Sequence, residues 1–161
     1  MKQSAGILLF RRKSPDPQFF LVHPGGPFFA KKDNGAWTIP KGEIVPAENP
    51  LDTAIREFEE ETGLRLSGPF IPLDAIVQKG GKHVFCWAVE GDLDPKKVVS
   101  NTFELEWPPR SGKRLSFPEI DKSGWFTLAE AKQLINERQI PLLERLMELL
   151  DGQGVSQKRR Q

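Results

Sequence analysis

The chain has 161 residues, with 23 Lys and Arg against 22 Asp and Glu and a formal net charge of +1. This length allows one domain with a substantial core and is too short for two ordinary domains. The charge balance excludes a general attraction to nucleic acid or membrane, so affinity for an anionic ligand must come from a local site. One cysteine excludes an internal disulfide, and no apolar stretch has the length of a signal segment or membrane span, so we expect a cytoplasmic protein.

The first half of the chain predicts strands, one long loop and one helix. Apolar runs bounded by turn-forming residues predict strands or short extended segments over 4–11, 19–23, 37–40, 70–78 and 83–90. The loop over 24–35 is rich in glycine, proline, phenylalanine and lysine, and long loops in compact domains are often functional. Cys86 lies in an apolar run, so we expect a buried thiol rather than a nucleophile.

The segment 50–62 is the clearest predicted helix. Asn49 suits the N-cap, Pro50 the first helical position and Gly63 the position after the last turn. Apolar side chains at helical spacing predict the buried face, and these are Leu51, Ala54, Ile55 and Phe58.

The pattern is weaker after residue 91. We expect strands over 98–107 and 123–126, a turn-rich loop over 108–113, and helices over 128–136 and 141–150. The polar, basic end of the chain predicts one domain over 1–150 followed by a disordered basic tail over 151–161. Because strands and helices are mixed without a regular βαβ alternation, the sequence predicts an α+β fold or a mixed-sheet sandwich.

Three carboxylates border the buried face of the helix over 50–62. At about 100° per residue, Glu57, Glu60 and Glu61 fall within an arc of roughly 100°. Two carboxylates about 6 Å apart repel by roughly 2–3 kcal/mol at an effective dielectric constant near 20. Glu60 and Glu61 also lie in the last turn, where the helix dipole disfavours negative charge. A bound divalent cation would turn this cost into a site, since Mg²⁺ takes carboxylate oxygens together with substrate phosphates. The alternative is a solvated charged face.

The spacing around this helix resembles the signature of the Nudix hydrolases. Gly42 is followed after five residues by Glu48, and after seven more by the run Arg56-Glu57-Phe58. The run Glu60-Glu61-Thr62-Gly63-Leu64 completes the pattern, with Phe58 at a position more often filled by an aliphatic residue. The resemblance covers about residues 3 to 150 and implies an α/β/α sandwich with a central mixed sheet. Within the superfamily, the run Trp37-Thr38-Ile39-Pro40-Lys41-Gly42 is most similar to the asymmetric diadenosine tetraphosphate hydrolases and related pyrophosphohydrolases.

The resemblance also implies roles for individual residues. Mg²⁺, or Mn²⁺ in its place, would be bound by Glu57, Glu60, Glu61 and the backbone carbonyl of Lys41, and Glu48 would either bind the metal or support its ligands from behind. Glu57 would also activate water, and the forked guanidinium of Arg56 would orient the carboxylates. Related enzymes often recruit a further base from outside the signature, for which Glu119 is our candidate. The alternative is that Glu119 is a solvated loop carboxylate.

The candidate substrate-binding residues lie in and before the signature, and they are Lys41, Gly42, Trp37, Phe28, Phe29 and Lys31. Lys41 would contact phosphate, and Gly42 would form the tight loop beside it. Phe28 and Phe29 could stack on a nucleobase, although loop aromatics also tuck beneath loops, and Lys31 could attract phosphate, although solvated lysines are the default. For Trp37, a packing role is the stronger alternative to contact with substrate.

Three functions fit these observations. The first is Mg²⁺-dependent hydrolysis of a phosphoanhydride in a nucleoside diphosphate derivative, above all a dinucleoside polyphosphate. The second is removal of pyrophosphate from an RNA 5′ end, which the absence of a marked basic stripe disfavours. The third is a non-catalytic Nudix-fold nucleotide-binding module, which the retained Glu57, Glu60 and Glu61 disfavour. We expect a small nucleotide ligand, no membrane association, and a monomer or homodimer.

Overall fold

A mixed β-sheet forms the centre of the molecule. The computed structural model describes residues 2–13 and 15–159, with side chains as far as residue 152. Five strands of the main sheet lie in the order β4-β5-β1-β2-β8, and β3 pairs with β1 beside this path. Their bounds are Gln3–Arg11 (β1), Gln18–Pro24 (β2), Lys41–Glu43 (β3), Ile71–Gln78 (β4), Lys82–Glu90 (β5) and Ile120–Phe126 (β8). β1 and β5 run parallel and the other pairs antiparallel, so the sheet is mixed, as predicted.

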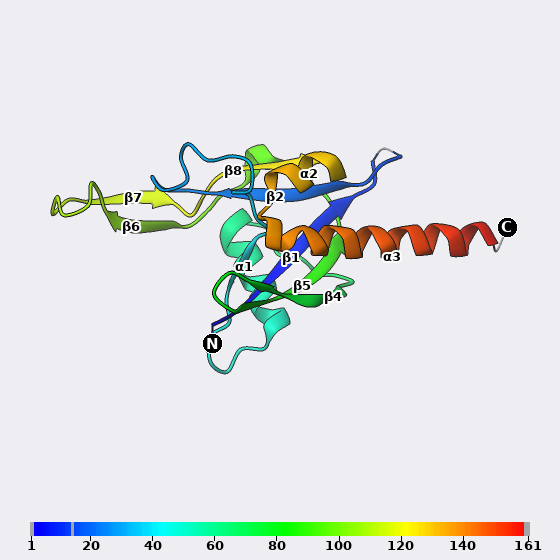
Figure 1. Cartoon of the computed structure of the whole chain (residues 1–161). Helices are drawn as coiled ribbons and strands as arrows, with labels where there is room; N and C mark the ends of the chain where they lie inside the picture. Colours follow the sequence, from blue (N-terminus) through cyan, green and yellow to red (C-terminus); the bar gives the residue numbers. More distant parts are fainter. Residues whose placement is uncertain (1, 14, 160–161) are drawn as a thin grey trace.

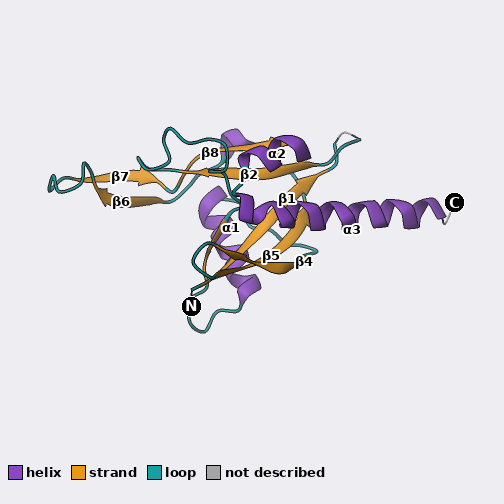
Figure 2. Cartoon of the chain, in the orientation of Figure 1, coloured by secondary structure: helices purple, strands orange, loops and turns teal. Residues whose placement is uncertain are grey.

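Helices cover both faces of this sheet (Figures 1 and 2). The helix α1 (Pro50–Thr62) packs on one face, and α2 (Leu128–Leu134) and α3 (Ile140–Arg159) pack on the other. Successive residues of β1 enter opposite cores, because side chains alternate along a strand: Leu8 packs with α3 and Ile7 with α1. This arrangement confirms the predicted α/β/α sandwich.

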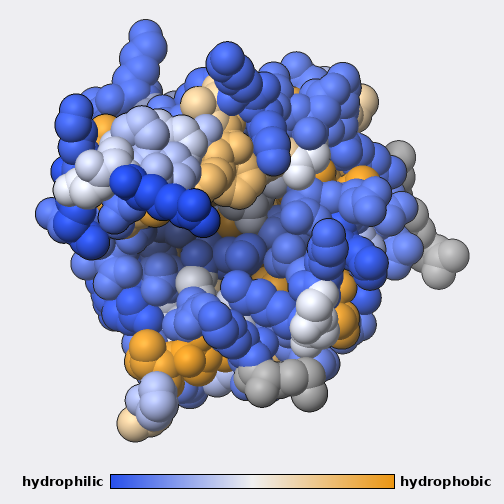
Figure 3. Space-filling view, turned by 60° about the vertical axis from the view of Figure 1, so that its left-hand side comes forward, coloured by the Kyte–Doolittle hydropathy of each residue, from blue (hydrophilic) through white to orange (hydrophobic). Residues whose placement is uncertain are grey.

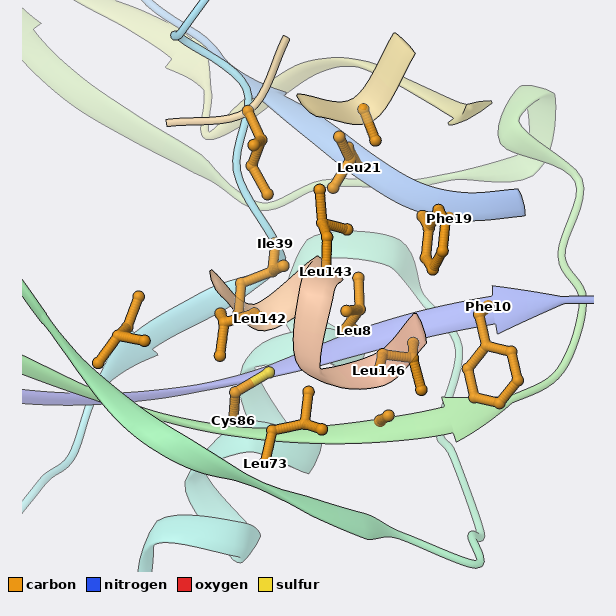
Figure 4. Packing of buried hydrophobic residues seen from close by; sticks show 14 of the residues in the cluster. Leu8, Phe10, Phe19, Leu21, Ile39, Leu73, Cys86, Leu142, Leu143 and Leu146 are labelled. Atoms are coloured by element: carbon orange, nitrogen blue, oxygen red, sulfur yellow. The ribbon is translucent and has the colours of Figure 1, made fainter. Parts of the chain in front are cut away.

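The core beneath α3 is closely filled by aliphatic and aromatic side chains. Figure 4 shows Leu142, Leu143 and Leu146 of α3 above β1 and β5, with Cys86 among them. Cys86 is buried, and burial raises the pKa of its thiol to about 12. A thiol held in this neutral form is a packing group, as predicted, because the thiolate is the nucleophilic form.

The helix α1 begins and ends where its capping residues predict. The Asn49 side chain accepts a hydrogen bond from the Asp52 backbone N–H at 2.8 Å, and Pro50 occupies the first turn. Gly63 ends the helix at a φ of 83°, and its N–H donates to the Glu59 carbonyl at 2.7 Å. These caps fix the position of the acidic last turn relative to the sheet.

A two-stranded hairpin lies outside the main sheet. β6 (Thr102–Glu106) pairs with β7 (Arg114–Pro118), and the pair projects from the body (Figure 1). The strand predicted over 98–107 therefore begins four residues later in the structure, at Thr102, and β7 was not predicted. β8 begins at Ile120 instead of residue 123. The loop predicted over 108–113 is the tip of the hairpin.

Further differences concern element ends. The segment 37–40 forms only isolated bridges, Val22 with Thr38 and Trp37 with Ile135, and the strand begins at Lys41. α3 continues to Arg159, past the predicted end at Leu150, so the described part of 151–161 is helical rather than an irregular tail. The division into a domain over 1–150 and a separate tail stays a prediction. The 3₁₀ turns η1 (Pro95–Lys97) and η2 (Glu137–Gln139) were not predicted. Among the described residues, no helix has the length and apolarity to cross a membrane.

Candidate metal and catalytic site

The site begins where β3 passes beneath α1. Gly42 pairs with Ala5 of β1, which places its backbone against the Glu57 carboxyl group. A Cβ at residue 42 would overlap the atoms of that carboxyl group. Gly42 therefore leaves space for the Glu57 carboxyl group in its present position, and no unusual backbone angle is involved.

Arg56 holds three of the signature carboxylates together. Its Nε and Nη2 donate to the two oxygens of Glu48 at 3.0 and 2.9 Å. Its Nη1 donates to Glu57 at 3.0 Å and to Glu60 at 3.1 Å. These bonds from Arg56, with a further bond from the Thr53 hydroxyl at 2.6 Å, lower the pKa of Glu48 to about 2. Glu48 is thus placed to orient Arg56, and direct ligation of a metal by Glu48 stays a prediction.

Glu61 is the buried member of the cluster. Its side chain is buried, and its Oε2 has no hydrogen-bond partner within the described part of the chain. Burial raises the pKa of Glu61 well above its ordinary value, and the charges of Glu57 and Glu119 raise it further. Lys41 opposes this shift through its charge and a backbone hydrogen bond, while burial lowers the pKa of Lys41 itself. A buried carboxylate oxygen without a partner is costly unless a ligand satisfies it.

Glu119 joins the cluster from a distant part of the sequence. Its backbone N–H donates to the Asn101 carbonyl at 2.8 Å, and the Asn101 N–H donates to the Glu60 carbonyl at 3.3 Å. The segment 99–101 therefore connects the last turn of α1 to Glu119. Burial and, to a smaller extent, the charge of Glu60 raise the pKa of Glu119. The same two causes raise the pKa of Glu57. The backbone connection through Asn101 therefore places Glu119 near enough to α1 to be affected by the charge of Glu60.

The donor set fits a divalent cation. The carboxylates of Glu57, Glu60, Glu61 and Glu119 repel one another, and one buried oxygen is unpartnered. Oxygen ligands of this kind are those that Mg²⁺ prefers. Within the described part of the chain, no three histidine, cysteine, aspartate or glutamate side chains are arranged so that they could hold a metal ion as they stand. This agrees with the hydrogen bonds of Arg56, which engage Glu57 and Glu60.

The predicted substrate-binding residues separate into buried and exposed groups. Trp37 is buried, its Nε1 donates to Asp33 at 2.6 Å, and its ring packs edge-on against Phe126, which fits the packing alternative. Phe28 is 59% exposed and Phe29 36% exposed, so neither is tucked beneath the loop. Lys31 is also exposed. Contact of any of these residues with substrate stays a prediction.

The loop over 24–35 is anchored by a histidine whose role the sequence did not reveal. His23 is fully buried, with Nδ1 2.6 Å from the Asp121 carboxylate and Nε2 2.6 Å from the Lys32 carbonyl. The imidazole therefore ties the loop to β8. Asp121 was not singled out in the sequence, and its only signal was its position two residues after Glu119.

A sequence model of the NUDIX domain matches residues 1–146, and the chain therefore belongs to the NUDIX domain family. Solved structures agree at the level of the fold. The *C. elegans* Ap4A hydrolase binary complex is 20% identical with a TM-score of 0.67, covering 92% of this chain and 98% of that one. The NUDIX domain of *Shewanella oneidensis* NrtR, complexed with ADP ribose, is 17% identical with a TM-score of 0.64, covering 92% and 87%.

Curated relatives give closer similarity over shorter stretches. An asymmetrical bis(5′-nucleosyl)-tetraphosphatase of *Rattus norvegicus* is 40% identical over 100 residues, which are 55% of this chain and 64% of that protein. A protein of *Myxococcus xanthus* named octanoyltransferase is 30% identical over 129 residues, which are 80% of this chain but 32% of that protein. The chain thus spans less than two thirds of the length of these relatives.

Proposed function

We propose that this protein is a Mg²⁺-dependent hydrolase that cleaves a phosphoanhydride bond in a nucleoside diphosphate derivative, with a dinucleoside polyphosphate as the leading substrate. The observation that carries the proposal is the buried Oε2 of Glu61, which has no hydrogen-bond partner within the described residues and lies at the same end of α1 as Glu57 and Glu60. Arg56 offsets part of the repulsion at Glu57 and Glu60, but a buried carboxylate oxygen without a partner costs free energy unless a cation satisfies it.

The residues divide the chemical tasks between them. Glu57, Glu60 and Glu61 would hold the cation, which when bound neutralises phosphate oxygens and lowers the pKa of bound water. Glu119 forms no ion pair within the described part of the chain, and its raised pKa suits a group that accepts a proton from the attacking water. Lys41 lies beside Glu61 and would contact a substrate phosphate. No covalent intermediate is needed, because the oxygen of water bonds to one phosphorus atom while the bridging P–O bond breaks and the other phosphate leaves.

The substrate class is supported by the relatives and by the loop. Three of the relatives have names that denote cleavage of a phosphate chain. They are a bis(5′-nucleosyl)-tetraphosphatase, a probable DHNTP pyrophosphohydrolase and an RNA pyrophosphohydrolase. The exposed Phe28 and Phe29 supply stacking surfaces that tolerate any base. We therefore expect selectivity for the phosphate chain over the base. A cytoplasmic location, and a monomeric or homodimeric state, stay predictions.

A substrate panel tests the proposal. Purified protein is assayed with dinucleoside polyphosphates, nucleoside triphosphates, nucleotide sugars and triphosphorylated RNA, with Mg²⁺, Mn²⁺ or excess chelator, and the products are identified. We expect diadenosine tetraphosphate to give a nucleoside monophosphate and a nucleoside triphosphate only when metal is present. Faster turnover of the RNA would favour the 5′-end alternative, and tight nucleotide binding without turnover would favour the non-catalytic module.

A further inference from the structure

The hairpin β6–β7 continues directly from the site. Pro118 ends β7, and Glu119 follows it in the chain. A two-stranded hairpin contributes little stability by itself, and this one stands apart from the main sheet (Figure 1). Figure 3 shows the side from which it projects, where polar surface surrounds a central hollow and apolar side chains form a patch at the rim. The hairpin is thus an extension of the wall that carries Glu119.

The loop over 24–35 is packed along the hairpin. A Cβ at Gly25 would overlap the Pro118 carbonyl, and a Cβ at Gly26 would lie 2.9 Å from the Phe103 ring, so both glycines permit a close approach at the base. Further out, the rings of Phe28 and Trp107 meet edge-on, with centroids 5.4 Å apart and an angle of 81°. Phe28 remains 59% exposed in this pair. Loop and hairpin therefore form one arm with an accessible aromatic surface near its tip.

The tip of the arm carries uncompensated positive charge. Arg110 and Lys113 form no ion pair within the described part of the chain, whereas Arg114 pairs with Glu104 at 3.3 Å. In the loop, the Lys32 ammonium lies 5.7 Å from the Phe29 ring centroid. An aromatic surface combined with free cations is the combination that binds a nucleobase together with its phosphates.

The length of the hairpin separates this surface from the carboxylates. Thr102 pairs with Pro118 at the base, and Trp107 lies five residues further along. At the rise of an antiparallel strand this corresponds to about 17 Å. A nucleobase attached next to the cleaved anhydride does not extend that far, whereas the second nucleoside of a dinucleoside polyphosphate does.

We propose that Phe28 and Trp107, with Arg110 and Lys113, form a distal subsite that binds the nucleoside at the far end of a dinucleoside polyphosphate. This inference rests on the proposed function of the carboxylate site. It assigns the hairpin the task of selecting long phosphate chains, because a short substrate placed at Glu119 leaves the arm empty.

The test is a comparison of two substrates in arm variants. Trp107→Ala and Phe28→Ala should each raise KM for diadenosine tetraphosphate about tenfold, as loss of a base–aromatic stack does, while kcat changes little. KM for ADP-ribose, whose base is next to its anhydride, should not change. Trp107→Phe should restore most of the affinity, and Arg110→Gln with Lys113→Gln should raise KM for the long substrate and reduce its dependence on salt.

Leu115→Ala is the matched control, because Leu115 is an exposed, non-aromatic residue of the same hairpin. An equal KM effect of Leu115→Ala and Trp107→Ala, or equal effects of Trp107→Ala on both substrates, would overturn the subsite. Selective loss of triphosphorylated RNA affinity would overturn the choice of a dinucleoside. If the wild type hydrolyses neither substrate, the proposed function fails, and the subsite is then decided by calorimetric affinity for diadenosine tetraphosphate in wild type and Trp107→Ala.

Discussion

Gly42 and Glu57 are in direct contact across the β3–α1 interface, and the contact leaves no room for a Cβ at residue 42. Gly42→Ala should therefore displace the Glu57 carboxyl group without straining the backbone. A small misplacement of a catalytic group can cost about 100-fold in rate, so we expect kcat to fall by about that factor while the melting temperature changes little. Steady-state kinetics and thermal denaturation measure the two quantities.

Gly152→Ala provides the control, because nothing lies within 4 Å of a Cβ at that position and the residue is in α3. This variant should keep full activity. A Gly42→Ala protein with wild-type kcat would show that the position of Glu57 does not matter for turnover.

The buried Glu61 predicts how stability depends on pH and metal. A raised folded-state pKa means that the folded protein holds its proton more tightly than the unfolded chain does. The associated stability is present below the ordinary value of 4.5 and is lost as pH rises through the raised pKa. The melting temperature of the metal-free protein should therefore fall as pH rises from that value. Mg²⁺ should oppose this loss, because binding adds about 2.7 kcal/mol to the free energy of unfolding at a concentration of 100 Kd.

Glu61→Gln separates this explanation from a general effect of pH. The amide is neutral, so the metal-free variant should match or exceed the wild type in melting temperature at neutral pH, and its response to Mg²⁺ should be lost. Calorimetry with and without chelator measures both. A lower metal-free stability would assign Glu61 a structural hydrogen bond instead.

Glu119 should control the acid side of the pH–rate profile. Its pKa is raised by burial and by Glu60, and the charged form is the one that accepts a proton. Glu119→Gln should lower kcat by about 10²–10⁴-fold, the usual contribution of a positioned base, and should remove the acid limb that belongs to this group. Glu106→Gln on β6 is the control and should leave the profile unchanged. An unaltered acid limb in Glu119→Gln would return the role of base to Glu57.

The parts of this structure that are determined locally could be predicted from the sequence. Asn49, Pro50 and Gly63 set the bounds of α1 through their own backbone and capping preferences. The carboxylates Glu57, Glu60 and Glu61 could be identified by the resemblance, because they lie on one helix that fixes their spacing in the sequence. The hairpin strand β7 could not be predicted, because its residues are mostly exposed and show no buried alternation.

Contacts between distant parts of the chain could not be predicted from the sequence either. The coupling of Glu119 to Glu60 passes through Asn101, and the anchoring of the loop passes from His23 to Asp121. Neither connection leaves a spacing pattern, because each depends on how distant segments pack.

Arg56 provides the last prediction, because one guanidinium contacts three carboxylates at once. Arg56→Lys keeps the charge but presents a single ammonium, which cannot bond to both oxygens of Glu48 and to Glu57 together. The pKa of Glu48 should therefore rise from about 2 toward its ordinary value of 4.5. In the wild type, the stability linked to this group is present above pH 4.5 and is lost as pH falls toward 2, so the variant should show less of this loss of stability in acid.

Misoriented ligands in Arg56→Lys should also weaken Mg²⁺ affinity or activity by about 10–100-fold. A carboxyl titration followed by NMR, together with a Mg²⁺ activation curve, measures both effects. Arg65→Lys is the control, since Arg65 is exposed and pairs with Glu59 at 3.5 Å. If Arg56→Lys left both the Glu48 titration and the activation curve as they are in the wild type, charge alone would account for Arg56, and the forked geometry would have no role.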